Sequence, residues 1–506
     1  MSKTYPVVLA VMLAACQLGD ERDPLDSETQ SLTPEERGRD IWFNNTYGGE
    51  KFFSLVLPYH PDPLRRIRIG FQEVVDTPRS MRFDVWGVIN DPDCEANPEG
   101  GMDLCPDPES SGVIGIRFKG PSPAGDGTNA FGAACAACHA GFNPVTPPDD
   151  PNDPEWDNIH ATIGNQYLDF GAIFGANLAP TDVRALMFAA WPNGAVDTTL
   201  LFSDNIMNAG TVTAFWEHPN RPTFDVGMDV PKLRNGQGGD DDVGGDLATL
   251  RVYTNIGVCF FECVAGPATV GVPIDIDTCR ATCPDFPPQQ DLDDVGAFLG
   301  SHTAPQLPGY ESRLLSGLGK LVFNAQCASC HKNTGAQARV LSNDEVIALA
   351  DDPANTTNAC RSLTSNWEEG KLWAQFSSDV YKDRIAAGDR GYRVMPLSGI
   401  WSTPPLLHNQ SIGEVAPADA SPWTRASYFW SAMGELLSTD RVPKINVTPI
   451  DLPGIPAGTP LAYVFSRDPT TGQVLCDDVI ENRGHHYGAG LPGWAKVLLV
   501  YYLQFQ

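Results

Sequence analysis

Two short cysteine–histidine segments constrain the fold of this chain more than any other feature. Residues 132–141 read GAACAACHAG and residues 324–333 read NAQCASCHKN, so each contains the pattern C-x-x-C-H. This pattern is the attachment signature of c-type haem. Two sulfurs about one helical turn apart can bond to the two vinyl groups of one porphyrin, and the next residue then faces the iron. The sequence therefore predicts two covalently bound haem c groups.

The histidine directly after each second cysteine is suited to be the proximal iron ligand. A redox-active thiol pair or half of a zinc site is the alternative for a single C-x-x-C. Zinc does not require the trailing histidine, and the two pairs are far apart in the sequence, so we favour haem. The two predicted sets of haem-binding residues are Cys135, Cys138 and His139, and Cys327, Cys330 and His331.

The N-terminal residues predict export. Lys3 is followed by an apolar run over residues 7–15, which has the size of a signal-peptide core and is too short to span a bilayer. LAAC at residues 13–16 resembles the lipobox of bacterial lipoproteins, which leaves a lipid on Cys16; a secretory signal with a chance cysteine is the alternative. In such lipoproteins Gln17, rather than aspartate, favours the outer membrane, facing the periplasm or the cell surface. No other stretch is apolar enough for a transmembrane helix, so we expect membrane contact only through this lipid.

Composition and charge restrict the class of protein. With 506 residues, 42% of them hydrophobic, the chain is long enough for about three domains and is not typical of a disordered protein. Its 48 glycines and 43 prolines indicate many loops. The net charge of −29 would repel nucleic-acid phosphates, so we expect no nucleic-acid partner, and any electron-transfer protein that binds the chain should be basic.

The remaining cysteines predict disulfides. The chain has thirteen cysteines, and eight remain after Cys16 and the four haem cysteines are assigned. In an exported protein this even number favours four disulfides. Two C-x-x-x-C pairs each lie on one helical face and would bond in antiparallel fashion, a third pair is close in sequence, and the last follows by elimination. Other pairings are open as well. The expected pairs are Cys259–Cys283, Cys263–Cys279, Cys94–Cys105 and Cys360–Cys476.

Helices are expected before both motifs and at the C-terminus. TPEERGRDIWFNN begins with Thr33 as a helix cap, Pro34 in the first turn and Glu36 three residues after the cap. Before the second motif the apolar residues at helical spacing are Leu314, Leu315, Leu318, Leu321 and Val322. In the closing helix, the stripe expected to pack across that helix is Trp494, Val497, Leu498, Tyr501 and Tyr502.

We expect a mainly α fold with extensive loops and two cytochrome c-like haem domains. Between residues 143 and 300 a helical pattern is sustained only over TDVRALMFAAW, so the N-terminal domain should be enlarged by long loop insertions. Proline-rich SHTAPQLPGY is the expected linker, and the polar residues after the signal suit a flexible tether. The expected units are a lipoprotein signal peptide over 1–15, the tether over 16–36, the N-terminal haem domain over 37–300 and the C-terminal cytochrome c domain over 301–506.

Four further segments, together with the two motifs and the long acidic middle, carry a family resemblance. They are IWFNNTYGGEKFF, RFDVWGVINDPDC, PLSGIWSTPPLLHNQS and ENRGHHYG. From about Gly38 to the C-terminus the chain resembles the dihaem c-type cytochromes related to rubber oxygenase, a branch of the bacterial dihaem cytochrome c peroxidase superfamily. The resemblance implies a haem oxidoreductase. In rubber oxygenases the N-terminal haem binds dioxygen and the C-terminal haem, with two protein ligands, moves electrons, whereas the peroxidases assign these roles differently.

The resemblance also implies candidates for the second axial ligand of the C-terminal haem. His485 in RGHHYG matches the family element G-H-x-[FY]-G before the last helix. Met395 in RVMPLSG is the rival, because methionine followed by proline is a common ligand context in cytochrome c. His486 and His408 are the remaining alternatives, and His408 is better suited to a hydrogen bond near the haem edge.

The N-terminal haem has no clear sixth ligand in the sequence. His160, Met187 and Met207 are alternatives, although each suits a core or surface position better. An open iron position is where dioxygen or peroxide would bind. Arg251 and Tyr253, in LRVYTNIG, resemble a family segment near that haem and are the candidate catalytic residues, with loop packing as the alternative.

The acidic loop GQGGDDDVGGD is the one candidate for a further ion. Asp240, Asp242 and Asp246 supply carboxylates, which suit Ca²⁺. Their spacing is not that of an EF-hand, so a solvated acidic loop is favoured over a calcium site.

These features predict an exported oxidoreductase in which one haem activates dioxygen or peroxide and the other relays electrons. An electron-transfer cytochrome with two six-coordinate haems is the alternative, and such a carrier would dock to basic partners through its acidic surface. A haem-bearing surface protein that binds a ligand without turnover is the third interpretation.

Overall fold

A computed structural model describes several ranges of the chain, and helices outnumber strands in them. Each sheet in these ranges contains only two strands, which are antiparallel. The expected mainly α fold with extensive loops is therefore confirmed. Within these ranges, none of the helices combines the length and the hydropathy that crossing a bilayer requires. The described residues are 32–60, 66–196, 209–212, 214–215, 281–331, 340–342, 391–393, 397–467, 471–476 and 478–506.

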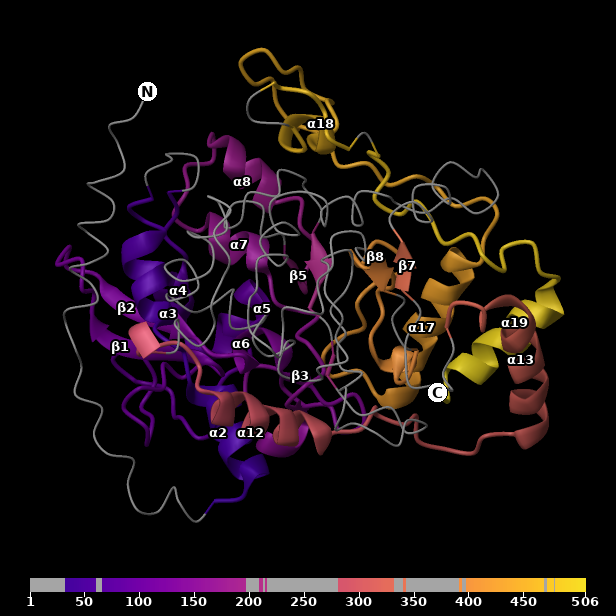
Figure 1. The fold of residues 1–506 in the computed structure, drawn as a ribbon, viewed down its shortest axis with the longest axis horizontal. Helices are drawn as coiled ribbons and strands as arrows, with labels where there is room; N and C mark the ends of the chain where they lie inside the picture. The colour runs from indigo at the N-terminus through magenta and orange to yellow at the C-terminus, as the bar shows by residue number, and fades with distance from the viewer. Residues whose placement is uncertain are drawn as a thin grey trace.

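Figure 1 shows two groups of elements side by side. We call the described part of residues 32–300 the N-terminal lobe and the described part of residues 301–506 the C-terminal lobe. The lobes are in contact through Tyr167, whose hydroxyl donates to the Ala416 carbonyl oxygen at 2.9 Å and accepts from Arg425 at 3.0 Å. Interactions across the two lobes therefore include partly buried hydrogen bonds.

In the N-terminal lobe, helix α2 (Pro34–Asn44) packs against α12 (Gln289–Gly300), as Figure 1 shows. Arg37 donates two hydrogen bonds to the Asp294 carboxylate, at 2.7 and 2.8 Å. Gly38 permits the close approach of the two helices, because a Cβ at this position would lie 2.0 Å from the Asp294 carbonyl oxygen. The first and last helices of this lobe thus form one tightly packed pair.

In the C-terminal lobe, helix α13 (Arg313–Gln326) packs against the last helix, α19 (Gly493–Leu503). A glycine again lies at the contact. A Cβ on Gly319 would lie 2.1 Å from the Leu498 carbonyl oxygen and 2.6 Å from Cβ of Tyr502. The second lobe therefore repeats the arrangement of the first, with its first helix packed on its last.

The predicted positions of α13 and α19 are correct, and the predicted packing stripe of α19 is correct in part. Ser316, Gly319 and Phe323 are the buried residues of α13, whereas most of the expected leucine stripe faces solvent. Two helices that pack at such short distance need small side chains at their contact, and this requirement outweighs the apolar period. Trp494 and Val497 were expected to pack across α13 but are exposed, whereas Leu498 and Tyr502 of the same predicted stripe lie at the contact with Gly319. The exposed leucines of α13 are Leu314, Leu315, Leu318 and Leu321.

The other elements of the N-terminal lobe are short and surround two adjoining apolar clusters. Strands β1 and β2 pair with Phe118 opposite Phe131, and β2 leads into the first C-x-x-C-H segment. The elements are α3 (Gly49–Lys51), the π-helix η2 (Phe52–Val56), α4 (Phe71–Asp76), the 3₁₀ helix η4 (Arg79–Met81), α5 (Arg82–Trp86), β1 (Ile116–Pro121), β2 (Asn129–Ala133), α6 (Ala136–His139), β3 (Gly141–Phe142), the 3₁₀ helix η5 (Trp156–Asn158), β4 (Ile159–His160), α7 (Phe170–Gly175), α8 (Val183–Phe188), β5 (Ala195–Val196) and β6 (Gly210–Thr211).

Helix α17 (Pro422–Leu436) contributes buried residues to the apolar core of the C-terminal lobe. Ser421 caps it by accepting a hydrogen bond from the Thr424 N–H, and a proline occupies its first turn. Trp401 is fully buried in the same core and donates from Nε1 to the Pro305 carbonyl oxygen at 2.8 Å, which ties the segment before α13 to this lobe. The remaining elements are β7 (Val340–Ser342), β8 (Gly391–Arg393), the 3₁₀ helix η9 (Ile400–Ser402) and α18 (Leu461–Phe465).

Candidate haem-attachment sites

The first C-x-x-C-H segment forms a single helical turn, α6, directly after β2. The His139 N–H donates to the Cys135 carbonyl oxygen at 3.1 Å, which closes the turn. Gly115, with a left-handed φ of 71°, passes so close that a Cβ there would lie 2.1 Å from the Ala137 nitrogen. Backbone contacts therefore help to hold the turn in place.

Aromatic side chains surround the His139 ring. Trp42 from α2 and Phe215 both pack on it, with ring centres at 5.7 and 4.5 Å, and both are fully buried. Trp42 donates from Nε1 to the Ala161 carbonyl oxygen at 2.9 Å, and its ring centre lies 6.2 Å from that of Phe298 on α12. The α2–α12 pair therefore fixes an indole against the predicted proximal histidine.

Burial keeps the Cys135, Cys138 and Cys327 thiols protonated. It raises the pKa of Cys135 and of Cys138 to about 12 and that of Cys327 to about 11. None of the four motif cysteines is in a disulfide. Zinc sites and redox-active thiol pairs both use thiolates, whereas thioether attachment leaves neutral sulfur beside an apolar porphyrin. Among the described side chains, moreover, no group of three or more His, Cys, Asp and Glu residues is arranged to hold a metal ion.

The second C-x-x-C-H segment continues directly from α13. Cys327 is the C-cap of that helix, and its N–H donates to the Phe323 carbonyl oxygen at 2.8 Å. The next turn is closed by the N–H groups of Cys330 and His331, which both donate to the Cys327 carbonyl oxygen, at 3.0 and 2.8 Å. Both motifs thus adopt the same tight turn, in which the histidine follows one turn after the first cysteine.

His485 faces His331 in the second site. The ring centres are 6.0 Å apart and the ring planes are inclined by 56°. His485 has a left-handed φ of 56°, and Arg441 supports this turn by donating to the Gly484 carbonyl oxygen at 2.7 Å. A metal bound between two imidazoles at about 2 Å from each nitrogen separates the ring centres by about 6 Å. The spacing of these two histidines therefore fits one iron between them.

The His485 imidazole is neutral at pH 7. Burial, followed by the charge of His331, lowers the pKa of His485 to about 4. Its Nδ1 is buried and has no hydrogen-bond partner among the described residues. A neutral imidazole is the form that binds metals, so the chemistry of this side chain also fits an iron ligand.

The rivals of His485 lie elsewhere or outside the described residues. Met395 is outside them. His486 is next to His485 and has its pKa lowered, mainly by burial. His408 lies in a loop that reaches the N-terminal lobe, where its carbonyl oxygen accepts a hydrogen bond from the Thr211 N–H at 2.6 Å. His485 is thus the candidate that the described structure brings opposite the motif histidine.

Two candidates for the sixth ligand of the predicted N-terminal haem, His160 and Met187, lie in other surroundings. The His160 ring packs on His302, with ring centres 5.7 Å apart, and burial lowers the pKa of His160 to about 4. Met187 is buried in the apolar core around Phe188. The predicted site residues that lie outside the described ranges are Met207, Asp240, Asp242, Asp246, Arg251 and Tyr253.

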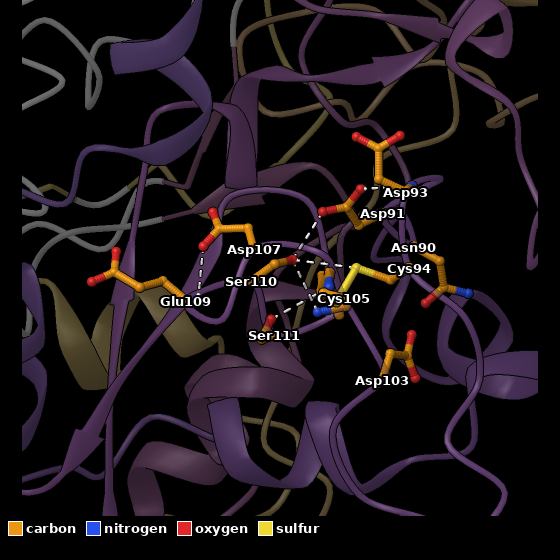
Figure 2. Close-up of a disulfide and its surroundings, with 12 residues drawn as sticks. Asn90, Asp91, Asp93, Cys94, Asp103, Cys105, Asp107, Glu109, Ser110 and Ser111 are labelled. Carbon is orange, nitrogen blue, oxygen red and sulfur yellow. Dashed lines mark hydrogen bonds between the residues drawn. A yellow bond between two sulfur atoms is a disulfide. The ribbon is translucent and has the colours of Figure 1, made fainter. Parts of the chain in front are cut away.

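The predicted disulfide between Cys94 and Cys105 is confirmed. Figure 2 shows Ser110 beside it, and the Ser110 hydroxyl donates to Asp91 at 2.9 Å. A cavity of about 190 Å³ adjoins this disulfide and is also lined by Arg39, whose guanidinium lies over two aromatic rings. Acidic and basic side chains both line the cavity, so its charge selects no single class of ligand.

Two further cysteines, Cys283 and Cys476, are also disulfide-bonded, as expected. Their partners are not among the described residues, so their pairing is still a prediction. The cysteines of the expected pairs that lie outside the described ranges are Cys259, Cys263, Cys279 and Cys360.

Sequence reasoning missed helix α12 and the aromatic contacts of His139. The signal for α12 was present, because four apolar residues recur at helical spacing and are buried. Phe215 had no comparable signal, since its contact with His139 joins two segments that are distant in sequence. The buried apolar residues of α12 are Leu292, Val295, Phe298 and Leu299.

A scan of protein-family models and a search of curated proteins found no match to this chain. The functional assignment therefore rests on the two motifs, on the resemblance in the quoted segments and on the geometry of the sites.

Proposed function

We propose that the protein is an exported dihaem c-type cytochrome that acts as an oxidoreductase of the rubber oxygenase-like branch. One observation carries the proposal: His331 follows its two cysteines at the end of α13, and the His485 ring faces it at 6.0 Å. Two imidazoles so placed suit the two axial positions of one iron. The neutral state of His485 and the protonated thiols of Cys135, Cys138 and Cys327 support the same group.

Each lobe would then be a cytochrome c-like domain, with a boundary close to residue 300. In support, each motif lies beside a packed pair formed by the first and last helices of its lobe, α2 with α12 and α13 with α19. Trp42 of α2 contacts His139, and α13 runs directly into Cys327. The helix pairs would hold the two haem groups in related surroundings.

A bound haem supplies one-electron chemistry and, where one axial position is open, a site for dioxygen or peroxide. His331 and His485 would occupy both axial positions at the second site, which suits electron relay. Trp42 and Phe215 would keep water from the His139 ring and fix its orientation. Because the N-terminal haem binds dioxygen in the rubber oxygenases that the chain resembles, we assign activation of the oxygen species to the first site.

The same proposal places the protein at the outer membrane through a lipid on Cys16, facing either the periplasm or the cell surface. Its redox partner would be a small oxidant such as dioxygen or peroxide, or a basic electron-transfer protein, because the chain carries a net charge of −29. Assays with polyisoprene, hydrogen peroxide and small phenols would identify the class of substrate.

Ligand-binding spectroscopy separates this enzyme from the alternative, an electron carrier with two six-coordinate haems. The isolated protein should show a high-spin or oxygen-ligated haem whose spectrum changes on addition of carbon monoxide to the reduced protein or cyanide to the oxidised protein. Two low-spin spectra that respond to neither ligand would refute the catalytic assignment and favour the carrier.

A further inference from the structure

A short hairpin of the C-terminal lobe reaches the N-terminal lobe. We call residues 406–412 the finger. Leu406 and Ile412 form an antiparallel bridge at its base, with N–H to O distances of 2.8 and 3.3 Å. Ile412 is fully buried in the same core as α17, and the Gly413 N–H donates to Glu435 of that helix at 2.9 Å. The base of the finger is therefore fixed in the C-terminal lobe.

The tip of the finger is hydrogen-bonded to Thr211 of β6 and to Gly194, which directly precedes β5. Gln410 donates from Nε2 to the Thr211 hydroxyl at 2.6 Å and to the Gly194 carbonyl oxygen at 3.2 Å. The Thr211 N–H in turn donates to the His408 carbonyl oxygen at 2.6 Å. A Cβ on Gly194, which has a left-handed φ of 70°, would lie 2.8 Å from Gln410 Nε2. The glycine thus leaves room for the glutamine amide.

Gln410 occupies an unfavourable position. Its φ of 54° is left-handed, a conformation that is strained for a residue with a Cβ. The side chain is 6% exposed, and its Oε1 is buried without a hydrogen-bond partner among the described residues. A glycine would avoid both penalties. Strain of this kind is typical of functional positions. We therefore attribute the presence of glutamine at this position to the contact that its amide makes.

The finger is also joined to the segments that contact the two motif histidines. Thr211 lies four residues before Phe215, whose ring centre is 4.5 Å from that of His139. On the other side, Asn409 donates from Nδ2 to the carbonyl oxygen of Glu481, at 2.8 Å, and Glu481 lies four residues before His485. A displacement of the finger would therefore shift the surroundings of both histidines.

We propose that Gln410 is a positioning residue that fixes the two haem-attachment sites relative to each other and thereby sets the rate of electron transfer between them. In this step one electron passes from the reduced site of His331 to the oxidised site of His139, and no bond forms or breaks. The inference rests on the proposed dihaem function. It gives a role to Gln410, a residue for which the described structure shows no contact with His139 or His331.

The test compares two substitutions at Gln410. Gln410→Ala keeps the left-handed strain and loses the amide, whereas Gln410→Gly relieves the strain and loses the amide. Both should slow intramolecular electron transfer after rapid photoreduction by on the order of tenfold or more, because small displacements of reacting centres have large effects on rate. Gln410→Gly should do so without lowering the melting temperature, and both should speed hydrogen exchange of the Thr211 amide.

Two further variants make the test specific. Thr211→Val removes the hydroxyl acceptor and should slow the transfer, with no additional effect in the double variant with Gln410→Ala. Asn446→Ala removes another hydrogen bond between the lobes, from Nδ2 to the Ala190 carbonyl oxygen at 3.4 Å, and should leave the rate unchanged.

The outcomes separate this inference from the proposed function. Wild-type rates in both Gln410 variants, or an equal loss in Asn446→Ala, would overturn the inference while the protein still carries two haems. A wild-type chain that carries no haem after maturation would refute the proposed function itself.

Discussion

His485 combines a left-handed backbone with a buried, neutral imidazole. The left-handed conformation alone costs about 1–2 kcal/mol for a residue other than glycine. A buried ring nitrogen without a partner is a second penalty. Binding to the proposed iron, held by His331, would offset both penalties and would account for a histidine in this turn between Gly484 and His486.

The assignment of His485 as an iron ligand predicts how the haem spectra change when this residue is replaced. His485→Ala should abolish the low-spin signal of one haem, because the iron loses an axial nitrogen, while the covalent haem content stays unchanged through Cys327 and Cys330. Electron paramagnetic resonance and optical spectra of the purified variant measure this. His486→Ala is the matched control and should keep the signal. If Met395→Ala removes it and His485→Ala does not, the assignment is wrong.

His160 predicts a dependence of stability on pH. Burial, followed by the charge of His302, lowers the pKa of His160 to about 4, against 6.5 for the free side chain. The unfolded chain therefore binds a proton at higher pH than the folded chain. The contribution of His160 to stability is present above pH 6.5 and is lost as the pH falls towards 4.

The contribution of His160 to the pH dependence of stability can be measured by comparing the wild type with His160→Gln. Between pH 7 and pH 4.5 the free energy of unfolding of the wild type should fall by about 2 kcal/mol more than that of the variant. Urea titrations at the two pH values provide the measurement. Equal falls in the two proteins would show that His160 is protonated at the same pH in the folded and unfolded chains.

Among the elements, the segment from α4 to α5 depends on a buried ion pair. Arg82 is fully buried and donates to both oxygens of Asp103, at 2.8 and 3.0 Å, and Arg79 donates to the same carboxylate at 2.8 Å. Asp103→Ala should lower the free energy of unfolding by about 3–5 kcal/mol, because it leaves a buried guanidinium without its anion.

The control for this substitution is Asp126→Ala. Asp126 pairs with Arg68 at 2.7 Å, but the pair is partly exposed, so its loss should cost about 1 kcal/mol or less. Urea unfolding of both variants provides the comparison. Similar losses in the two variants would contradict a special role for the buried pair.

The Cys94–Cys105 disulfide makes an independent contribution to the same lobe. It joins cysteines with a sequence separation of 11, and closing a loop of this size stabilises a protein by about 3 kcal/mol through the unfolded state. The double variant Cys94→Ala/Cys105→Ala should therefore unfold at lower urea concentration by about that free energy, with haem content unchanged. Loss of both haems from this variant would instead link the disulfide to haem attachment.

Local sequence signals predicted the elements that depend on neighbouring residues. The capping box of Thr33 and Glu36 begins α2 as expected, and the pattern from Thr181 contains α8. Helix α17 was missed, although its buried residues Ala426, Phe429 and Met433 recur at helical spacing. Trp494 and Val497 of α19 were misassigned to the contact with α13, because a count of apolar residues does not reveal a contact made through Gly319.

The candidate site likewise contains features that local sequence predicts and features that it does not. Each C-x-x-C-H turn is local, so its residues were readable from spacing alone. The encounter of His331 with His485 joins positions far apart in the chain, and only the family resemblance suggested it. The contacts of Phe215 and Gln410 with the other segments depend on the packing of the lobes, for which the sequence held no pattern.

At the scale of the whole molecule, two lobes of related design each present one motif histidine. In each lobe a glycine lets the first helix approach the last, Gly38 in one and Gly319 in the other. Partly buried contacts such as that of Tyr167 with Arg425 hold the lobes together. The proposed haems would then occupy one position in each lobe with a fixed relation between the two, as transfer of electrons between them requires.

The most direct test of this account is the number of haems on each chain. Protein matured in a host that attaches c-type haem should be heavier by two haem groups in intact mass spectrometry, and pyridine haemochrome analysis should give two haem c per chain. The pair Cys135→Ala/Cys138→Ala should reduce both values to one. A colourless wild-type product from such a host would contradict the account.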